Sequence, residues 1–482
     1  MKIRTRFSPS PTGYLHIGGV RTTLFSALFA AKHQGTFVLR IEDTDVLRSQ
    51  EQYAISQQED LQWLGIHWHE GPGVDGPYGP YWQSQRQAIY LRYYQLLEEK
   101  KQIYPCFCTE QALNLERKLQ LARSQPPRYS GKCRRLTADE IKHRLQQGDK
   151  PAWRFLVPEN SQIEFDDIIK GPQQFRSHDI GDFIVRRTDG TAPFLFCNAV
   201  DDALMQISHV LRGEDHLANT PRQIMLLQAL NLPMPHYGHL SLIVGEDGAK
   251  LSKRHGDFSI REMREQGYLP LAILNYLARL GHTNDNQTLL DFDHLACYFN
   301  IEKVSRSAAR FDRHQLFYWQ KMAVQSLAAP MIWRWLGPRV EDQVPITLQT
   351  QFVETIKANI VFPDDALKWA KILFHENAQI DSEGIQVIQA AGEQFFVEAE
   401  SAVDKYGTDM SAILAQMQTT LHLSGKKLFL PFRFALTGQS HGPELTHIAA
   451  ILGQKKLKHR LGRAFQLASG RENGENSHVK NI

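Results

Sequence analysis

Cysteine, net charge and long apolar runs are all scarce in this sequence of 482 residues. Its five cysteines, three of them between Cys106 and Cys133, do not make a disulfide framework in a chain this long. The N-terminal run MKIRTRFSPSPTG lacks an apolar core of signal-peptide length. No stretch approaches the roughly 18 uninterrupted apolar residues of a membrane span. These absences argue against a secreted or membrane-spanning protein, and we expect a cytoplasmic one.

The formal net charge of +3 is too small to indicate a nucleic-acid partner by itself, so such a partner would need local basic surfaces. One basic run lies near the C-terminus, where cations alternate with apolar residues at helical spacing. A run of this kind is usually a solvated helix face, and a contact for nucleic acid is the alternative. Its cations are Lys455, Lys456, Lys458, Arg460 and Arg463.

The chain is too long for one hydrophobic core, because cores usually stop growing at about 250–300 residues. Residues 3–7 read as a strand, residues 19–35 carry helical apolar spacing, and residues 37–41 read as a second strand. This pattern is typical of a βαβ unit and predicts a parallel sheet. Strand signals fade after residue 260. We therefore predict an α/β domain with an inserted α+β domain, followed by an all-α C-terminal half.

The segment after the first strand has the properties of an anion site. The run SPSPTGYLHIGG joins the strand to the helix, and its glycines allow a phosphate to approach the backbone. The free N–H groups and positive dipole end of the helix favour negative charge, and His16 adds a donor just before the helix. By itself, such an element is more often an ordinary glycine-rich turn with a surface histidine.

A second element changes that balance. The run GAKLSKRHG, residues 248–256, is a glycine-bounded loop that carries three cations within five residues. A solvated basic turn has this composition. A mobile loop that supplies lysines to a polyphosphate has the same composition, because compact ammonium groups can follow charge as it moves.

Together the two elements resemble the HIGH and KMSKS signatures of the class I aminoacyl-tRNA synthetases. The wording SPSPTGYLHIGGVRT with KLSKRHG is similar to the glutamyl enzymes in particular. Further runs extend this resemblance over nearly the whole chain. They are RIEDTD at 40–45, VDD at 200–202, LRGEDH at 211–216, NTPRQ at 219–223 and, more weakly, LPFRFALTG at 430–438.

The resemblance implies a Rossmann-type catalytic domain that activates L-glutamate with ATP and Mg²⁺ and transfers it to the 3′-terminal adenosine of tRNA(Glu). One alternative is a form that charges tRNA(Gln) with glutamate. Another is a catalytically silent RNA-binding paralogue, against which the intact His16 and Lys253 stand. These two are the implied catalytic residues. The implied ATP-binding residues are His16, Gly18, Gly19, Lys250, Ser252 and Lys253.

Substrate choice requires a cationic pocket, because glutamate and glutamine have nearly the same shape and charge must separate them. Arg6 and Arg212, each at the end of an expected strand, are suitable readers of a carboxylate. One position departs from the family pattern, since Phe194 stands where a tyrosine is usual. By resemblance, Arg6, Ser10, Asn198 and Arg212 bind the carboxylates and Glu42 binds the α-ammonium.

A cluster of cysteines in the middle of the chain resembles a zinc site of some family members. Thiolates grouped this closely suit Zn²⁺, whereas reduced cysteines without metal are the alternative. The usual histidine is replaced by Arg135, and His143 is a second candidate for the fourth ligand. The implied ligands are Cys106, Cys108, Tyr129 and Cys133.

The resemblance also divides the chain into five parts and implies a monomer that binds tRNA, L-glutamate and ATP. The parts are the first half of the catalytic domain (1–104), an inserted acceptor-stem-binding domain with the possible zinc site (105–200), the second catalytic half with the KLSKR loop (201–256), a helical stem-contact domain (257–325) and an all-helical anticodon-binding region (326–482).

Overall fold

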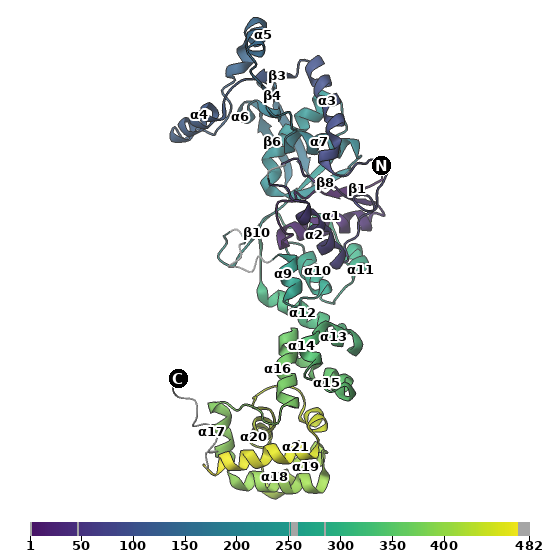
Figure 1. Ribbon diagram of the computed structural model, residues 1–482, viewed down its shortest axis with the longest axis vertical. Coiled ribbons are helices and arrows are strands. Elements are labelled where there is room, and N and C mark those ends of the chain that lie inside the picture. The colour runs from purple at the N-terminus through teal and green to yellow at the C-terminus, as the bar shows by residue number, and fades with distance from the viewer. Residues whose placement is uncertain (1, 46–47, 250, 252–258, 284–285, 471–482) are drawn as a thin grey trace. The chain divides into compact units, whose positions relative to one another are not determined.

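The computed structural model describes residues 2–45, 48–249, 251, 259–283 and 286–470. The chain forms two compact units, and the boundary between them falls within helix α12 (Arg313–Ser326). Unit 1 is Met1–Glu265 with Pro270–Trp319, and unit 2 is Gln266–Leu269 with Gln320–Ile482. Figure 1 labels their elements. Within the described ranges, no helix combines the length and the apolar character needed to cross a membrane.

The predicted βαβ unit is confirmed at the start of unit 1. Strand β1 (Arg4–Phe7) pairs in parallel with β2 (Thr36–Leu39), and helix α1 (Ile17–Lys32) connects them. All four residues of β2 are buried, as is most of the apolar surface of α1. Gly35 is needed at the turn into β2, because a Cβ there would overlap the carbonyl of Ile3.

The second part of the sheet is also parallel. Strand β8 (His209–Gly213) pairs with β9 (His236–Leu240), and helix α8 (Thr220–Leu230) connects them. Strand β8 lies beside β1, because Ser208 N donates to Arg4 O (2.9 Å) and the Arg6 side chain reaches Leu211 O. The carboxyl ends of β1, β8 and β9 therefore lie at one edge, which is where α/β sheets bind ligands.

Between these parallel halves lies an antiparallel sheet with the order β3 (Ile103–Cys106), β4 (Ala152–Phe155) and β7 (Phe183–Arg186). A separate hairpin joins β5 (Gln162–Asp167) to β6 (Gly171–Arg176). The turn of this hairpin rests on β9, where Ile168 N donates to Tyr237 O at 2.9 Å. Glycine is required opposite the turn, since a Cβ on Gly238 would lie 2.8 Å from Ile168 Cγ1.

Helices and one short parallel strand pair complete unit 1. Its strands do not end near residue 260 as predicted, because β10 (Ile243–Val244) pairs with β11 (Ala309–Arg310). A strand of two residues is too short to give a periodic signal in the sequence, so β11 could not be predicted. The main helices are α2 (Glu51–Trp63), α3 (Gln87–Glu99), α4 (Glu110–Ala122), α5 (Ala138–Gln146), α7 (Phe194–Leu204), α9 (Ile260–Glu265), α10 (Pro270–Arg279) and α11 (Phe292–Tyr298).

Unit 2 is helical throughout its described residues, which confirms the all-α prediction for this part of the chain. Its core is rich in aromatic rings, including Phe352, Phe395, Phe396 and Phe432. Its helices are α13 (Ala329–Leu336), α14 (Pro338–Glu341), α15 (Gln349–Ile356), α16 (Pro363–Phe374), α17 (Ser382–Ala391), α18 (Glu393–Tyr406), α19 (Met410–Leu421), α20 (Lys426–Thr437) and α21 (Leu445–Ala468).

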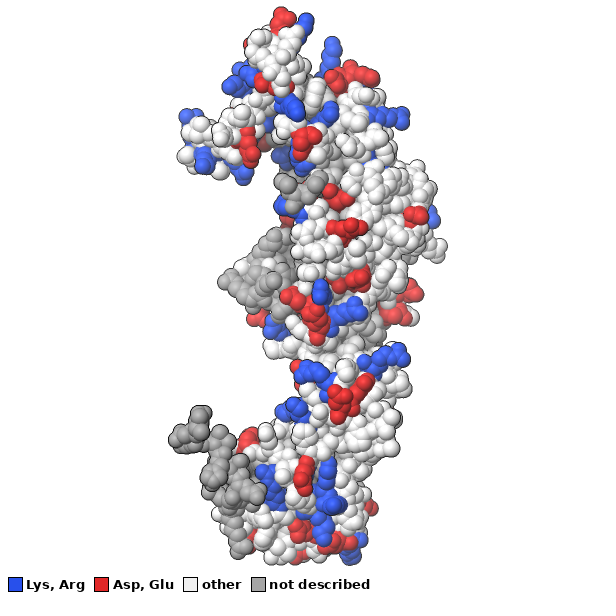
Figure 2. Space-filling view, viewed as in Figure 1, with Lys and Arg blue, Asp and Glu red and all other residues white. Residues whose placement is uncertain are grey.

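The C-terminal basic run lies on α21 and is used largely for packing inside unit 2. The buried guanidinium of Arg460 donates to the carbonyls of Ile372 and His375, near the end of α16, and to that of Leu436 in α20. Lys456 donates to Phe374 O at 2.8 Å. Burial and, as the smaller cause, the nearby charge of Arg463 together lower the pKa of Arg460 to about 10. Arg460 is therefore buried and binds the ends of other helices, and the half-buried Lys456 binds the end of α16 in the same way. Figure 2 shows basic and acidic side chains intermixed on the face drawn.

Candidate active site

A pocket of about 400 Å³ opens at the carboxyl edge of the parallel strands. It brings together all of the described candidates from the sequence for binding of nucleotide and amino acid. Lys250, Ser252 and Lys253 lie outside the described residues, although Leu251 between them lines the pocket. The candidates that line it are Arg6, Ser10, His16, Gly18, Gly19, Glu42, Asn198 and Arg212.

One wall of the pocket is the start of α1. His16 is the residue before the helix and has an extended backbone, so the first N–H groups of α1 are at the pocket surface, as an anion site requires. Gly18 allows the imidazole to lie over this turn, because a Cβ at that position would be 3.3 Å from the His16 ring. A larger residue at position 18 would therefore displace His16.

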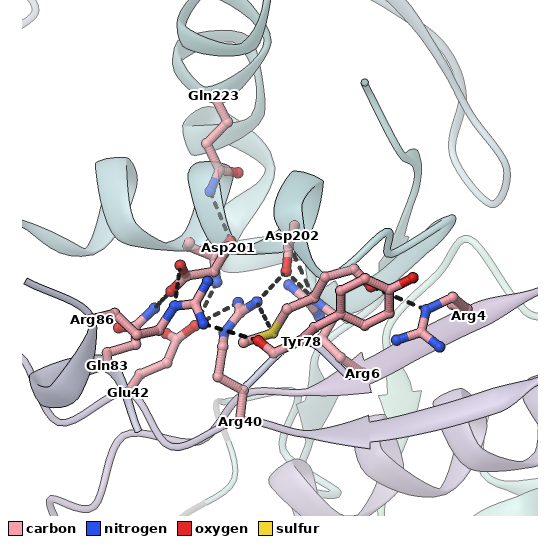
Figure 3. Close-up of polar contacts among 12 residues, drawn as sticks. Arg4, Arg6, Arg40, Glu42, Tyr78, Gln83, Arg86, Asp201, Asp202 and Gln223 are labelled. Atoms are coloured by element: carbon pink, nitrogen blue, oxygen red, sulfur yellow. Dashed lines mark hydrogen bonds and ion pairs between the residues drawn. The ribbon is translucent and has the colours of Figure 1, made fainter. Parts of the chain in front are cut away.

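The floor of the pocket is a buried network of alternating charges (Figure 3). Asp202 of α7 lies between two arginines, with Oδ1 at 3.2 Å from Arg6 Nε and 2.8 Å from Arg40 Nη1. Arg40 also contacts Glu42, Nη2 to Oε1, at 3.0 Å. Burial alone would raise the pKa of Asp202, but the two arginines outweigh it and lower that pKa. Asp202 therefore stays ionised and fixes Arg6 at the end of β1.

A chain of amide hydrogen bonds continues from Glu42 across the pocket. Asn198 Nδ2 donates to Glu42 Oε1 (2.6 Å), and Gln223 Nε2 donates to Asn198 Oδ1 (2.8 Å). Gln223 Oε1 then accepts from Arg212 Nη2 at 2.7 Å. These bonds orient both amides, so that one side of the pocket ends in a carboxylate and the other in a guanidinium.

Glu42 and Arg212, the two charged ends of this series of hydrogen bonds, each keep a buried atom without a hydrogen-bond partner among the described residues, Glu42 Oε2 and Arg212 Nη1. Arg212 is held by neutral groups (Thr220, Gln223 and His239), and no described carboxylate forms an ion pair with it. Burial lowers its pKa to about 10, and burial raises the pKa of Glu42. A ligand with an ammonium group and a carboxylate would satisfy both atoms.

Phe194 lines the same pocket at the first residue of α7. Its ring lies 5.3 Å from the imidazole of His216, between centroids. Burial lowers the pKa of His216 to about 4, with Arg212 as the second cause. The ring therefore contributes an apolar surface beside a neutral imidazole, where a tyrosine would add a hydroxyl.

Several residues of the site carried no role in the sequence interpretation. Arg21 is buried, lines the pocket and donates to Ser241 O at 2.9 Å. A second buried carboxylate, Asp201, accepts from Gln83, Arg86 and Tyr90 at 2.7–2.9 Å and holds α7 in place. Both residues could have been noticed in the sequence, because each is a charged residue inside an apolar helical run. A charged residue is rarely buried without a function or a partner.

The cysteine cluster lies apart from this pocket, at the end of β3. The Sγ atoms of Cys106, Cys108 and Cys133 all lie within 4.8 Å of one another. The phenol oxygen of Tyr129 is 3.5 Å from both Cys106 and Cys108 Sγ. Three sulfur atoms and one oxygen thus surround one point, which suits a tetrahedral metal ion. Arg135 is exposed.

His143, the second candidate for the fourth ligand, is not part of the cluster. His143 lies exposed on α5, where its Nε2 is 2.9 Å from the Gln147 amide. Arg154 stacks 3.8 Å above the Tyr129 ring and donates to Cys106 Sγ at 3.2 Å. Burial opposes ionisation of the Cys106 thiol, but hydrogen bonds from Arg154, the Cys108 backbone and Tyr129 together outweigh burial and lower the pKa of Cys106. Burial, with the neighbouring Cys133 and Cys106 thiols, raises the pKa of Cys108 to about 11, so the two close thiols are shifted in opposite directions.

The sequence matches two family models. The first, "tRNA synthetases class I (E and Q), catalytic domain", covers residues 2–318, and the second, "Anticodon binding domain", covers residues 327–465. Two similar relatives are glutamate–tRNA ligase 2 of Coxiella burnetii, 49% identical over 96% of this chain and 100% of its own, and glutamate–tRNA ligase 2 of Nitrosococcus oceani, 51% identical over 95% and 97%.

A similar solved structure is that of a glutamate tRNA ligase from Elizabethkingia meningosepticum in complex with its amino acid. It has a TM-score of 0.87 and 29% sequence identity, and the match covers 97% of this chain and 99% of that chain.

Proposed function

This chain belongs to the class I aminoacyl-tRNA synthetases for glutamate and glutamine, and we propose that it joins L-glutamate to tRNA(Glu) at the expense of ATP. The observation that supports this substrate is that two oppositely charged residues line one pocket and each keeps a buried atom without a hydrogen-bond partner among the described residues, Glu42 Oε2 and Arg212 Nη1. Glutamine would leave the Arg212 charge without a counter-ion, and a buried unpaired charge is costly.

The reaction has two steps. An oxygen of the glutamate α-carboxylate attacks the α-phosphorus of ATP, and the bond to the leaving pyrophosphate breaks. A ribose hydroxyl of the terminal adenosine then attacks the carbonyl carbon of the adenylate, and AMP leaves. The protein forms no covalent bond with the substrate, so positioning and charge stabilisation provide the catalysis.

The two loops hold the nucleotide in this proposal. His16, Gly18 and Gly19 receive ATP at the start of α1, where the helix N–H groups favour a phosphate. We assign Lys250, Ser252 and Lys253, which lie outside the described residues, to binding of the phosphates, with Lys253 neutralising the departing pyrophosphate. Mg²⁺ accompanies ATP, mainly through phosphate oxygens and water.

Four side chains and one carboxylate orient the amino acid. Arg212 reads the γ-carboxylate, and Arg6, with Asp202 fixing its position, lies near the α-carboxylate together with Ser10. Asn198 completes the carboxylate contacts, and Glu42 receives the α-ammonium through its open oxygen.

The other parts of the chain serve the tRNA. We assign residues 105–200 to the acceptor end, 257–325 to the stem and 326–482 to the anticodon, and we expect a monomer that works in the cytoplasm, where its tRNA is. Cys106, Cys108, Tyr129 and Cys133 would hold one structural Zn²⁺, because their donor atoms surround a single point.

The test is charging of separately purified tRNA(Glu) and tRNA(Gln) with labelled glutamate, and with glutamine as the control amino acid. We expect glutamate on tRNA(Glu) and no product with glutamine. Glutamate on tRNA(Gln) would establish the broader form of the enzyme. A well-folded protein that charges neither tRNA would overturn the proposal in favour of a silent RNA-binding paralogue.

A further inference from the structure

The arginine that faces the pocket from β8 is held by a histidine, and that histidine is held by an aspartate from the inserted hairpin. Arg212 Nε donates to His239 Nε2 at 3.1 Å, and His239 Nδ1 lies 2.5 Å from Asp167 Oδ2. All three side chains are buried, and the two contacts join β5 of the hairpin to β8 and β9 of the parallel sheet. The hairpin therefore reaches within two side chains of the pocket.

The proton positions along this chain follow from the donors. The guanidinium can only donate, so His239 Nε2 must be an acceptor and carries no proton. A neutral imidazole then holds its proton on Nδ1 and donates it to Asp167. Burial and the nearby Arg212 charge lower the pKa of His239, which keeps the ring neutral. Asp167 thus selects the one tautomer that can receive Arg212.

The two oxygens of Asp167 do different work. Oδ1 accepts backbone N–H groups, those of Ile169 (2.9 Å) and Lys170 (2.7 Å) in the hairpin turn and that of His239 (3.2 Å) in β9. Oδ2 faces the imidazole. Gly238 allows the turn to approach β9 this closely, since a Cβ there would meet Ile168 at 2.8 Å. The turn is thus built onto the strand that carries His239.

We propose that Asp167 and His239 are positioning residues for substrate selection: they fix the tautomer and the direction of Arg212, so that Nη1 stays open to the γ-carboxylate of glutamate. The proposal rests on the proposed function, because it deepens the role given to Arg212. It makes the inserted hairpin part of amino-acid recognition. Neither residue touches the substrate.

The substitution Asp167→Asn separates the two oxygens. Asparagine keeps Oδ1 for the turn and presents an amide N–H₂ to the ring, which forces His239 Nδ1 to accept and moves the proton to Nε2. Two donors, Nε2–H and Arg212 Nε–H, would then face each other. Loss of a charge-linked hydrogen bond predicts an increase of about tenfold or more in the glutamate KM, with the ATP KM and the melting temperature little changed.

The matched control is Asp166→Asn, the same chemical change at the exposed neighbouring residue of β5. We expect it to keep the wild-type glutamate KM. The second variant, His239→Gln, retains an acceptor for Arg212 but has no tautomer to select. Adding Asp167→Asn to His239→Gln should therefore raise the glutamate KM by less than about threefold. The effects of two substitutions are independent only when the residues are not coupled, and here Asp167 acts through His239.

These measurements distinguish a failure of the proposed function from a failure of the positioning role of Asp167 and His239. Wild-type protein that does not charge tRNA with glutamate would overturn the proposed function itself. With active wild-type protein, an unchanged glutamate KM in Asp167→Asn would overturn the positioning role. The same factor in both backgrounds, or equal damage to the glutamate KM, the ATP KM and the melting temperature, would show that Asp167 only supports the fold and would overturn it as well.

Discussion

Replacing Arg212 by methionine should weaken glutamate binding by at least about 30-fold while leaving the free protein about as stable as the wild type. Burial lowers the pKa of this arginine to about 10, and no described carboxylate pairs with it. A depression of that size corresponds to roughly 3 kcal/mol of unfavourable burial of charge in the free protein. Methionine has a similar volume and removes this cost.

The removal has an opposing cost. Gln223 Oε1 and His239 Nε2 lose the donor that Arg212 provides, and each buried acceptor left without a partner costs about 1–3 kcal/mol. Thr220 can still serve His239, since its hydroxyl lies 3.0 Å from Nε2. The two effects nearly cancel, so the melting temperature of the free protein should move by only a few degrees.

In glutamate binding, by contrast, no favourable effect offsets the loss of the Arg212 charge. Removing one member of a desolvated ion pair costs about 2–5 kcal/mol, which is about 30-fold to several-thousand-fold in the glutamate KM at about 1.4 kcal/mol per factor of ten. Arg212→Lys should lie in between, because an ammonium keeps the charge but not the forked geometry.

The assay is tRNA charging at varied glutamate with saturating ATP, then at varied ATP, together with thermal unfolding with and without glutamate. The wild type should be stabilised by glutamate, and Arg212→Met should not. A glutamate KM within threefold of wild type, or a glutamate-induced rise in melting temperature that survives the substitution, would refute the reasoning. Equal loss for both substrates would indicate a damaged pocket.

Three further predictions follow from the other sites. Lys253→Ala should lower the rate of pyrophosphate exchange, measured with tRNA present, by about 100-fold or more without changing the melting temperature, and near-wild-type exchange would remove Lys253 from the mechanism. Protein purified without chelator should contain one zinc per chain that Cys133→Ser loses and Tyr129→Phe weakens, whereas active wild-type protein with far less zinc would show free thiols. Burial raises the pKa of Asp60 to about 6, so its ionised form destabilises the fold as pH rises from about 4 to about 6. Asp60→Asn should stabilise the protein by about 1–3 kcal/mol at pH 7.5 and not at pH 4, and an equal effect at both values would contradict a titrating group.

The sequence predicts what depends on neighbours along the chain. The β1–α1–β2 unit was predictable because apolar spacing and the glycine-rich turn occur within the first 40 residues. The position of His16 one residue before α1 was predictable for the same reason. The close cysteines also gathered as their spacing suggested, with Cys108 and Cys133 Sγ atoms 3.6 Å apart, although the identity of any metal stays a prediction.

The rest depends on contacts between distant segments. Thr220, Gln223 and His239 are ordinary residues by type, and only the fold brings all three to Arg212. Asp167 lies 72 positions from His239, and no periodicity relates a hairpin turn to a buried strand. Hydrophobic pattern predicts which face of an element is buried and says nothing about which polar groups meet there.

The buried arginine of α21 has a consequence for synthesis of the protein. Ribosomes make the chain from its N-terminus, so α16 and α20 are complete before Arg460 exists. Until then the carbonyls of Ile372, His375 and Leu436 lack the cation that binds them, and Leu457 and Leu461 are missing from the core. The helical unit can therefore close only after residue 460 has been made. A nascent chain stalled before residue 460 should expose an apolar, chaperone-accessible surface while the parallel sheet of unit 1 is already complete.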